Sequence, residues 1–207
     1  MGMTYRFSRA NANALLEAKD TDGVFDAIDY ATDIADDLER EDFICEILGI
    51  GISESTDGIA RKIATRQMNL LYECDISIVT KKMVERAIDI LLALDKKVSS
   101  MPWDKTIASE WCSGIIDATH NTINKYKYTE PCCENGSGNY VYYGPSKEFV
   151  DIVKEVEKIY GWREYHYGYP WKNAEFIGSR PVRTVLQNVL KAMKNASDEF
   201  VFVLRRF

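Results

Sequence analysis

Residues 199–207 read EFVFVLRRF, a run of aromatic and β-branched side chains with almost no polar interruption before Arg205. Such a run predicts a β-strand buried on both faces. The segment before it, from Pro181 to about residue 195, has apolar residues at helical spacing. Proline is well tolerated in the first turn of a helix, so we expect a helix to begin there.

Further back from this strand, the second half of the chain alternates between strand-like and helix-like segments. Residues 139–143 and 162–169 are aromatic and strand-like, whereas residues 146–160 are amphipathic and end before Gly161. A loop rich in glycine and capping residues, TEPCCENGSGNY (129–140), precedes them. We interpret residues 129–207 as a small β-α-β-α-β unit.

The first half of the chain is interpreted as a series of helices. Ser8, Thr21 or Asp22, residues 53–56 and Thr80 are of types that cap helices, and each precedes apolar residues three and four apart. The predicted fold is therefore α+β but mostly α, with an N-terminal helical bundle over about residues 1–125. The predicted domains are an acidic bundle, 1–128, and a tyrosine-rich α+β subdomain, 129–207, which would permit one shared core.

Composition sets the broad class of the protein. The 207 residues carry a formal net charge of −6, with 46% hydrophobic residues, as is usual for a folded globular chain. There is neither an apolar run of membrane-spanning length nor a secretion signal, which predicts a cytoplasmic protein with no membrane partner. The five cysteines are irregularly spaced without a Cys-x-x-Cys pair, so no disulfide framework or zinc site is expected.

Charge is concentrated in one stretch, FDAIDYATDIADDLERED (25–42), which holds eight carboxylates and one arginine. Apolar residues at steps of three and four predict a helix here. On that helix the aspartates at 22, 26, 29, 33 and 36 would share one face. Like charges at this spacing repel by a few tenths of a kcal/mol per pair, so the predicted stripe calls for an explanation.

Three explanations remain open. The stripe is a solvated face, or it is a docking surface for a basic partner, or it is a metal site. Under the third, Asp33, Asp36, Glu39 and Asp42 would hold Mg²⁺ with carboxylates one helical turn apart. That spacing resembles the Glu-x-x-Glu and Glu-x-x-Asp motifs of all-α nucleoside triphosphate pyrophosphohydrolases, although aspartate dominates here and no second motif follows on a later helix.

The tyrosine-rich segment offers a second candidate surface. Strand alternation within WREYHYGYPW (162–171) would place Tyr165, Tyr167 and Tyr169 on one side, where they could stack bases of single-stranded nucleic acid. The basic residues of this half match no RNA-binding sheet or helix-turn-helix, so direct nucleic-acid binding is not favoured. An aromatic sheet core is the simpler interpretation, and exposed tyrosines would permit a homodimer.

No complete catalytic constellation is present, because neither histidine has an identifiable nucleophile to serve and no phosphate-binding glycine motif occurs. The sequence therefore favours binding over catalysis and requires no cofactor, apart from Mg²⁺ in the hydrolase alternative. The favoured hypothesis is a cytosolic inhibitor, of the immunity-protein or phage anti-defence type, that occupies a basic protein or nucleoprotein surface. Its predicted contacts are Asp26, Asp29, Asp33, Asp36 and Asp37.

Overall fold

The computed structural model describes residues 5–36, 43–50, 58–100, 127–131, 139–143, 147–148, 151, 171–172, 175–176 and 179–207. The chain divides into two compact units. Unit 1 comprises residues 1–91 and 181–207, and unit 2 comprises residues 92–180. The C-terminal residues thus share unit 1 with the N-terminal ones.

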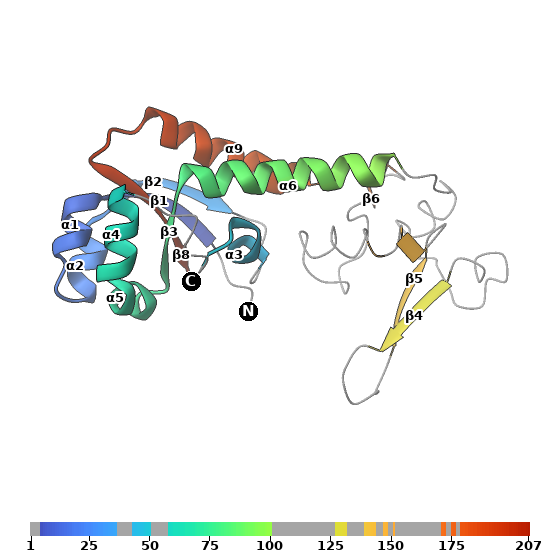
Figure 1. Cartoon of the computed structure of the whole chain (residues 1–207), viewed down its shortest axis with the longest axis horizontal. Helices are drawn as coiled ribbons and strands as arrows, with labels where there is room; N and C mark the ends of the chain where they lie inside the picture. Colours follow the sequence, from blue (N-terminus) through green and yellow to red (C-terminus); the bar gives the residue numbers. More distant parts are fainter. Residues whose placement is uncertain are drawn as a thin grey trace. The chain divides into compact units, whose positions relative to one another are not determined.

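Unit 1 is organised by a four-stranded antiparallel sheet (Figure 1). Its strands are β1 (Tyr5–Asn11), β2 (Ile28–Asp36), β3 (Ile76–Val79) and β8 (Phe200–Arg206), in the order β2-β1-β8-β3. The predicted C-terminal strand is confirmed: residues 201–205 are all buried. It pairs with β1 along its whole length, from Tyr5 opposite Arg206 to Asn11 opposite Phe200.

The predicted N-terminal helical bundle is wrong, because the described chain begins with a strand. Ser8 does not cap a helix but lies within β1 with its side chain fully buried. The cap is Asn11, whose side chain accepts a hydrogen bond from the Ala14 backbone N–H at 2.9 Å. The first helix, α1, therefore spans only Ala12–Glu17.

Four helices cover one side of the sheet. They are α1, α2 (Thr21–Asp26), α4 (Gly58–Arg66) and α5 (Met68–Glu73). Their buried residues Leu15, Val24, Ile63 and Leu71 form one cluster with alternate residues of the strands. The strand residues in this cluster are Ala10, Ile28, Ile76, Ile78, Val201 and Val203. A further short helix, α3, spans Phe43–Leu48.

Two longer helices are α6 (Lys81–Ser99) and α9 (Arg180–Asn195), and the parts of them that belong to unit 1 lie on the opposite side of the sheet (Figure 1). Strand residues that alternate with those of the first cluster, such as Phe7 and Leu204, are also fully buried. Val84 of α6 and Leu186 of α9 are fully buried too. The sheet is therefore buried on both faces, as the sequence of β8 predicted. Both predicted helix starts are confirmed: the Met83 N–H donates to the Thr80 hydroxyl at 3.3 Å, and Pro181 lies in the first turn of α9.

Helices α4 and α5 are separated by one residue, Gln67, which is buried. Its side-chain Nε2 donates to the backbone carbonyls of Leu16 at 2.8 Å and Ala18 at 3.0 Å. Since a buried side-chain amide without hydrogen bonds is costly, these bonds of Gln67 fix the end of α1 against the α4–α5 junction. This junction positions both surfaces discussed below.

In unit 2, the described residues include the end of α6 and two antiparallel strand pairs. One pair joins β4 (Lys127–Pro131) to β5 (Asn139–Tyr143), and the other joins β6 (Trp171–Lys172) to β7 (Glu175–Phe176). The Asp95 carboxylate of α6 accepts hydrogen bonds from the backbone N–H and the hydroxyl of Ser179, at 2.7 and 2.8 Å. That contact fixes the residue before α9 next to α6.

Candidate partner-binding surface

The predicted acidic helix is not formed. Residues 21–26 make the short helix α2, and residues 28–36 make the edge strand β2. The five predicted aspartates, from Asp22 to Asp36, therefore do not line one helical face. Asp26 remains exposed at the end of α2, whereas the structure gives Asp29 and Asp33 partners within the protein.

An irregularity in the β1–β2 ladder separates those two carboxylates. Phe7 pairs with Ile34 and Arg9 pairs with Asp29, so one residue of β1 lies opposite four residues of β2. Neighbouring residues of a strand point to opposite faces. Because Ser8 and Arg9 are neighbours, the carboxylates that they bind, of Asp33 and Asp29 respectively, are held from opposite faces of β1.

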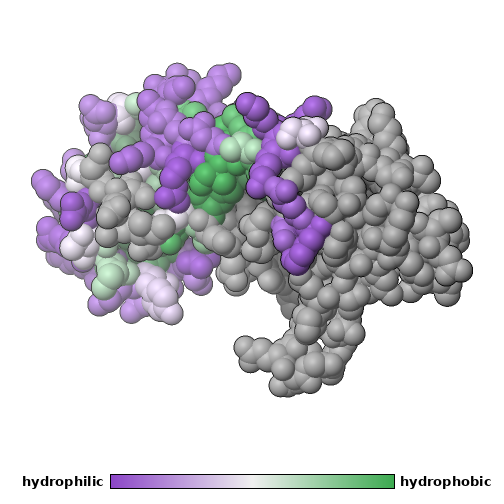
Figure 2. All heavy atoms as spheres, turned by 45° about the vertical axis from the view of Figure 1, so that its right-hand side comes forward, coloured by the Kyte–Doolittle hydropathy of each residue, from purple (hydrophilic) through white to green (hydrophobic). Residues whose placement is uncertain are grey.

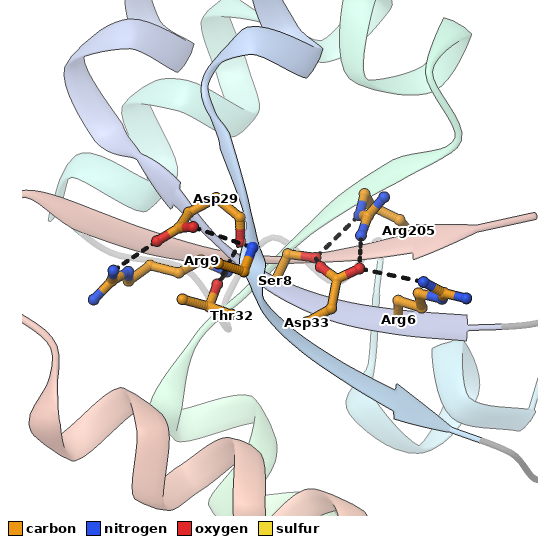
Figure 3. A network of polar contacts seen from close by, with 8 residues as sticks. Arg6, Ser8, Arg9, Asp29, Thr32, Asp33 and Arg205 are labelled. Carbon is orange, nitrogen blue, oxygen red and sulfur yellow. Dashed lines mark hydrogen bonds and ion pairs between the residues drawn. The ribbon is translucent and has the colours of Figure 1, made fainter.

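The Asp33 carboxylate lies at the centre of a polar network (Figure 3). It accepts hydrogen bonds from the Ser8 hydroxyl at 2.6 Å and from the Arg205 guanidinium at 2.5 Å. Arg6 adds an ion pair at 3.5 Å. The Arg205 side chain is only 5% exposed, and its guanidinium carbon lies 4.7 Å from the centre of the Tyr30 ring and 5.0 Å from that of Phe207. This network joins β2, β1 and β8.

The network shifts the pKa of Asp33. Burial, the largest single influence, acts to raise this pKa, but it is outweighed by the hydrogen bonds from Ser8 and Arg205, the positive charge of Arg205 and the hydrogen bond from Arg6. The pKa of Asp33 therefore lies below its ordinary value. The carboxylate is charged at neutral pH and serves to hold the sheet.

A lowered pKa in the folded state makes stability depend on pH. The network should contribute fully above the pKa of an unfolded aspartate, about 3.9, and its contribution should be lost as the pH falls through the lower folded-state value. In urea titrations from pH 6 to pH 2, we expect the stability difference between the wild type and Asp33→Asn to shrink at the acidic end. A difference that stays constant down to pH 2 would contradict this assignment.

Asp29 forms an ion pair with Arg9 at a position more exposed than that of Asp33. Its carboxylate binds the Arg9 guanidinium at 2.6 Å, with each side chain about one third exposed (32% and 33%). The Arg9 guanidinium also lies over the Phe200 ring, 4.2 Å from its centre. Like Asp33, Asp29 is thus used to hold strands together, which leaves less of its charge available to a partner.

The remaining predicted site residues are not described in detail. Asp36 ends β2 and its side chain is outside the description, while Asp37, Glu39 and Asp42 lie outside the described residues altogether. Tyr165, Tyr167 and Tyr169 lie outside them too. The helical spacing proposed for the Mg²⁺ site is overturned for Asp33 and Asp36, because both belong to a strand. Within the described part of the chain, no group of three acidic, histidine or cysteine side chains is arranged to hold a metal.

A different acidic surface is formed by α2 and α5, which contact each other. Met68 and Tyr72, one turn apart on α5, are 65% and 81% exposed, and Phe25 of α2 is 37% exposed. The same two helices carry the exposed carboxylates of Asp22, Asp26 and Glu73. We call this the α2–α5 surface; it consists of Asp22, Phe25, Asp26, Met68, Tyr72 and Glu73.

Carboxylates of this surface also influence a buried thiol, that of Cys74. Burial raises the pKa of Cys74, and the negative charges of Glu73, Asp22 and Asp75 raise it further. The carboxylates of Asp22 on α2 and Glu73 on α5 therefore both act on the Cys74 thiol. Among the described residues, Asp22, Asp26 and Glu73 form no ion pair, whereas Asp75 pairs loosely with Arg206 at 4.0 Å.

Figure 2 shows pale side chains of intermediate hydropathy exposed among strongly hydrophilic ones at the lower left, over the part of unit 1 where Figure 1 places α5. Sequence reasoning missed this surface because it assigned Met68 to the buried face of a single helix together with Ile63 and Leu71. The buried positions are 63, 67, 71 and 74, which keep helical spacing across Gln67, and Met68 turns outward. The regular spacing of those four positions was the available signal.

Comparison of the chain with protein-family models, with curated proteins and with solved structures gives no match. None of the helices in the described residues is both long enough and apolar enough to span a membrane. The functional argument therefore rests on the surfaces of unit 1.

Proposed function

We propose that this chain is a binding protein whose α2–α5 surface docks on a basic surface of a partner macromolecule. The observation that carries the proposal is the 81% exposed Tyr72 one helical turn from an exposed Met68, on two contacting helices whose exposed carboxylates Asp22, Asp26 and Glu73 form no ion pair with any described residue. Tyrosine and methionine are enriched at protein interfaces, and a large exposed aromatic ring is a typical binding hot spot. The carboxylates select a basic partner and accelerate its association.

This proposal keeps the partner class that the sequence predicts and changes the contacts. Asp29 and Asp33 are bound within the sheet, so Asp22 and Glu73 replace them as charged contacts beside Asp26, which the sequence already predicted. An inhibitor that covers a nucleic-acid-binding groove needs carboxylates at positions where the groove would hold phosphates. An immunity-type or anti-defence inhibitor of a nuclease or nucleoprotein is therefore the form of the function that we propose.

The first test uses the immobilised protein to capture partners from a lysate of the source cell or its host. We expect a basic protein that is retained at low salt and released at about 0.5 M salt, where the screening length is only a few ångströms. Identical columns carry two charge-reversed variants. One is Asp22→Lys/Asp26→Lys/Glu73→Lys, and the matched control is Asp89→Lys/Asp198→Lys/Glu199→Lys, which makes the same charge change at exposed sites elsewhere in unit 1.

With the purified partner, Tyr72→Ala should weaken binding by about thirtyfold, which corresponds to about 2 kcal/mol. The α2–α5 reversal should slow association by tenfold or more at low salt, because it removes the attraction that guides the encounter. Surface plasmon resonance measures both quantities. The proposal is wrong if the captured protein binds the α2–α5 reversal as tightly as it binds the control reversal.

A further inference from the structure

A second surface of unit 1 has the opposite charge. Helices α1 and α4 border an open groove with a volume of about 820 Å³, which is lined by Leu16, Gly58, Arg61, Lys62, Thr65 and Arg66. All but Leu16 come from α4, a helix without a single acidic residue. The groove therefore combines one apolar side chain from α1 with three cations and a hydroxyl from α4.

The three cations are available to a ligand. Arg61, Lys62 and Arg66 are exposed, and none of them forms an ion pair or a side-chain hydrogen bond with any described residue. No carboxylate lines the groove as far as the structure describes it. A cluster of like charges without counter-charges destabilises a helix slightly, so its presence here calls for an external anion.

The N-terminal end of α4 also favours the binding of an anion. Gly58 is the first residue of this nine-residue helix, and the N-terminal end of a helix carries a partial positive charge. Gly58 has a positive φ of 54°, and a side chain at this position would meet no atom of the described residues within 4 Å. As far as the described residues extend, the backbone at Gly58 is thus open to close approach by an anion.

From these observations, we propose that the α1–α4 groove binds a chain of phosphates, as in the backbone of single-stranded nucleic acid. Arg61 and Arg66 are separated by about 7 Å along the helix axis, at about 1.5 Å per residue. Successive charges along one strand can therefore meet successive cations, and guanidinium groups bind phosphate oxygens in pairs. The sequence did not favour direct nucleic-acid binding because it lacks a known motif, but contacts to phosphates alone require none.

This inference is independent of the α2–α5 surface, since the two use different helices and opposite charges. The experiment measures fluorescence anisotropy of a fluorescein-labelled oligothymidylate with the full chain at 50 mM salt. Three phosphate contacts on a single strand predict a salt slope of about −2, so affinity should fall about fifteenfold between 50 and 200 mM salt.

Two triple variants make the test specific. Arg61→Gln/Lys62→Gln/Arg66→Gln should weaken binding at least tenfold. Lys81→Gln/Lys82→Gln/Arg86→Gln, which removes the same charge from exposed sites on α6, should weaken it less than threefold. Thermal melting checks that both variants fold. Absence of binding by the wild type at 50 mM salt, or equal losses in the two variants, would overturn the proposal.

Competition then identifies the source of the phosphates. Displacement of the probe by inorganic polyphosphate at equal phosphate concentration would show that the phosphate chain alone is sufficient. Displacement by unlabelled oligothymidylate only would show that the nucleic acid is the ligand. Displacement by polyglutamate at equal charge would overturn the assignment to phosphates and indicate an acidic protein instead.

Discussion

Replacing Asp33 with alanine should lower the free energy of unfolding by about 3–5 kcal/mol, which is the usual cost of removing one partner from a buried ion pair. The Arg205 side chain is 5% exposed and would keep its charge without the carboxylate that neutralises it. The buried Ser8 hydroxyl would lose its acceptor as well. Urea denaturation at pH 7, followed by circular dichroism, measures the difference.

Two further variants separate this effect from a general loss of charge. Asp29→Ala breaks an ion pair whose members are about one third exposed, so it should cost no more than about 1 kcal/mol. Asp33→Leu combined with Arg205→Met leaves no buried charge behind and should recover much of the stability lost in Asp33→Ala. If the Asp29 and Asp33 variants are destabilised equally, the Asp33 network does not have the structural role assigned to it.

Phe7→Ala is the second substitution with a large expected effect, about 3–5 kcal/mol. Phe7 is fully buried in a central strand, opposite Leu204 of β8 and Ile34 of β2. Loss of the ring would leave a cavity that the two neighbouring strands prevent from collapsing. Thermal and urea unfolding should both show the loss, with the cooperative transition retained.

Tyr72→Ala is the matched control for Phe7→Ala, because it also removes an aromatic ring but from an 81% exposed site. Its stability should stay within about 0.5 kcal/mol of the wild type. The same variant is used in the binding test. This stability measurement therefore also shows whether a loss of partner affinity comes from the missing contact or from unfolding of the variant. A strongly destabilised Tyr72→Ala would mean that the ring is packed rather than exposed.

Local sequence patterns predicted some elements of unit 1 correctly. The run in β8 is too uniformly apolar for a surface strand, and the starts of α6 and α9 carry recognisable capping or first-turn residues. Residues 28–36 were misjudged because two periods coexist there. Ile28, Ala31 and Ala35 fit a helix, whereas Ile28, Tyr30, Thr32 and Ile34 alternate as in a strand. Pairing with β1 decides in favour of the strand, and no local pattern contains that information.

The pairing of Asp29 and Asp33 within the protein could not be predicted, for a related reason. The partners of Asp33 come from β1 and from the far end of the chain, since Arg205 is 172 residues away in sequence. Counting charges in one segment treats each carboxylate as unpaired, and only the strand order shows which are neutralised. The exposed positions of Met68 and Tyr72 follow from the burial of the polar residue Gln67, whose side chain hydrogen-bonds the Leu16 and Ala18 carbonyls of a distant segment.

The pairing of β1 with β8 also has a consequence for biosynthesis. The two middle strands of the sheet come from opposite ends of the described chain, so β1 leaves the ribosome long before its partner exists. Until residues 200–206 emerge, the apolar side chains of β1 and β3 lack the strand that lies between them. Contacts of such long sequence separation form slowly. We therefore expect the edges of β1 and β3 that β8 covers to stay unpaired in the nascent chain until β8 has emerged, which would favour aggregation of the incomplete chain.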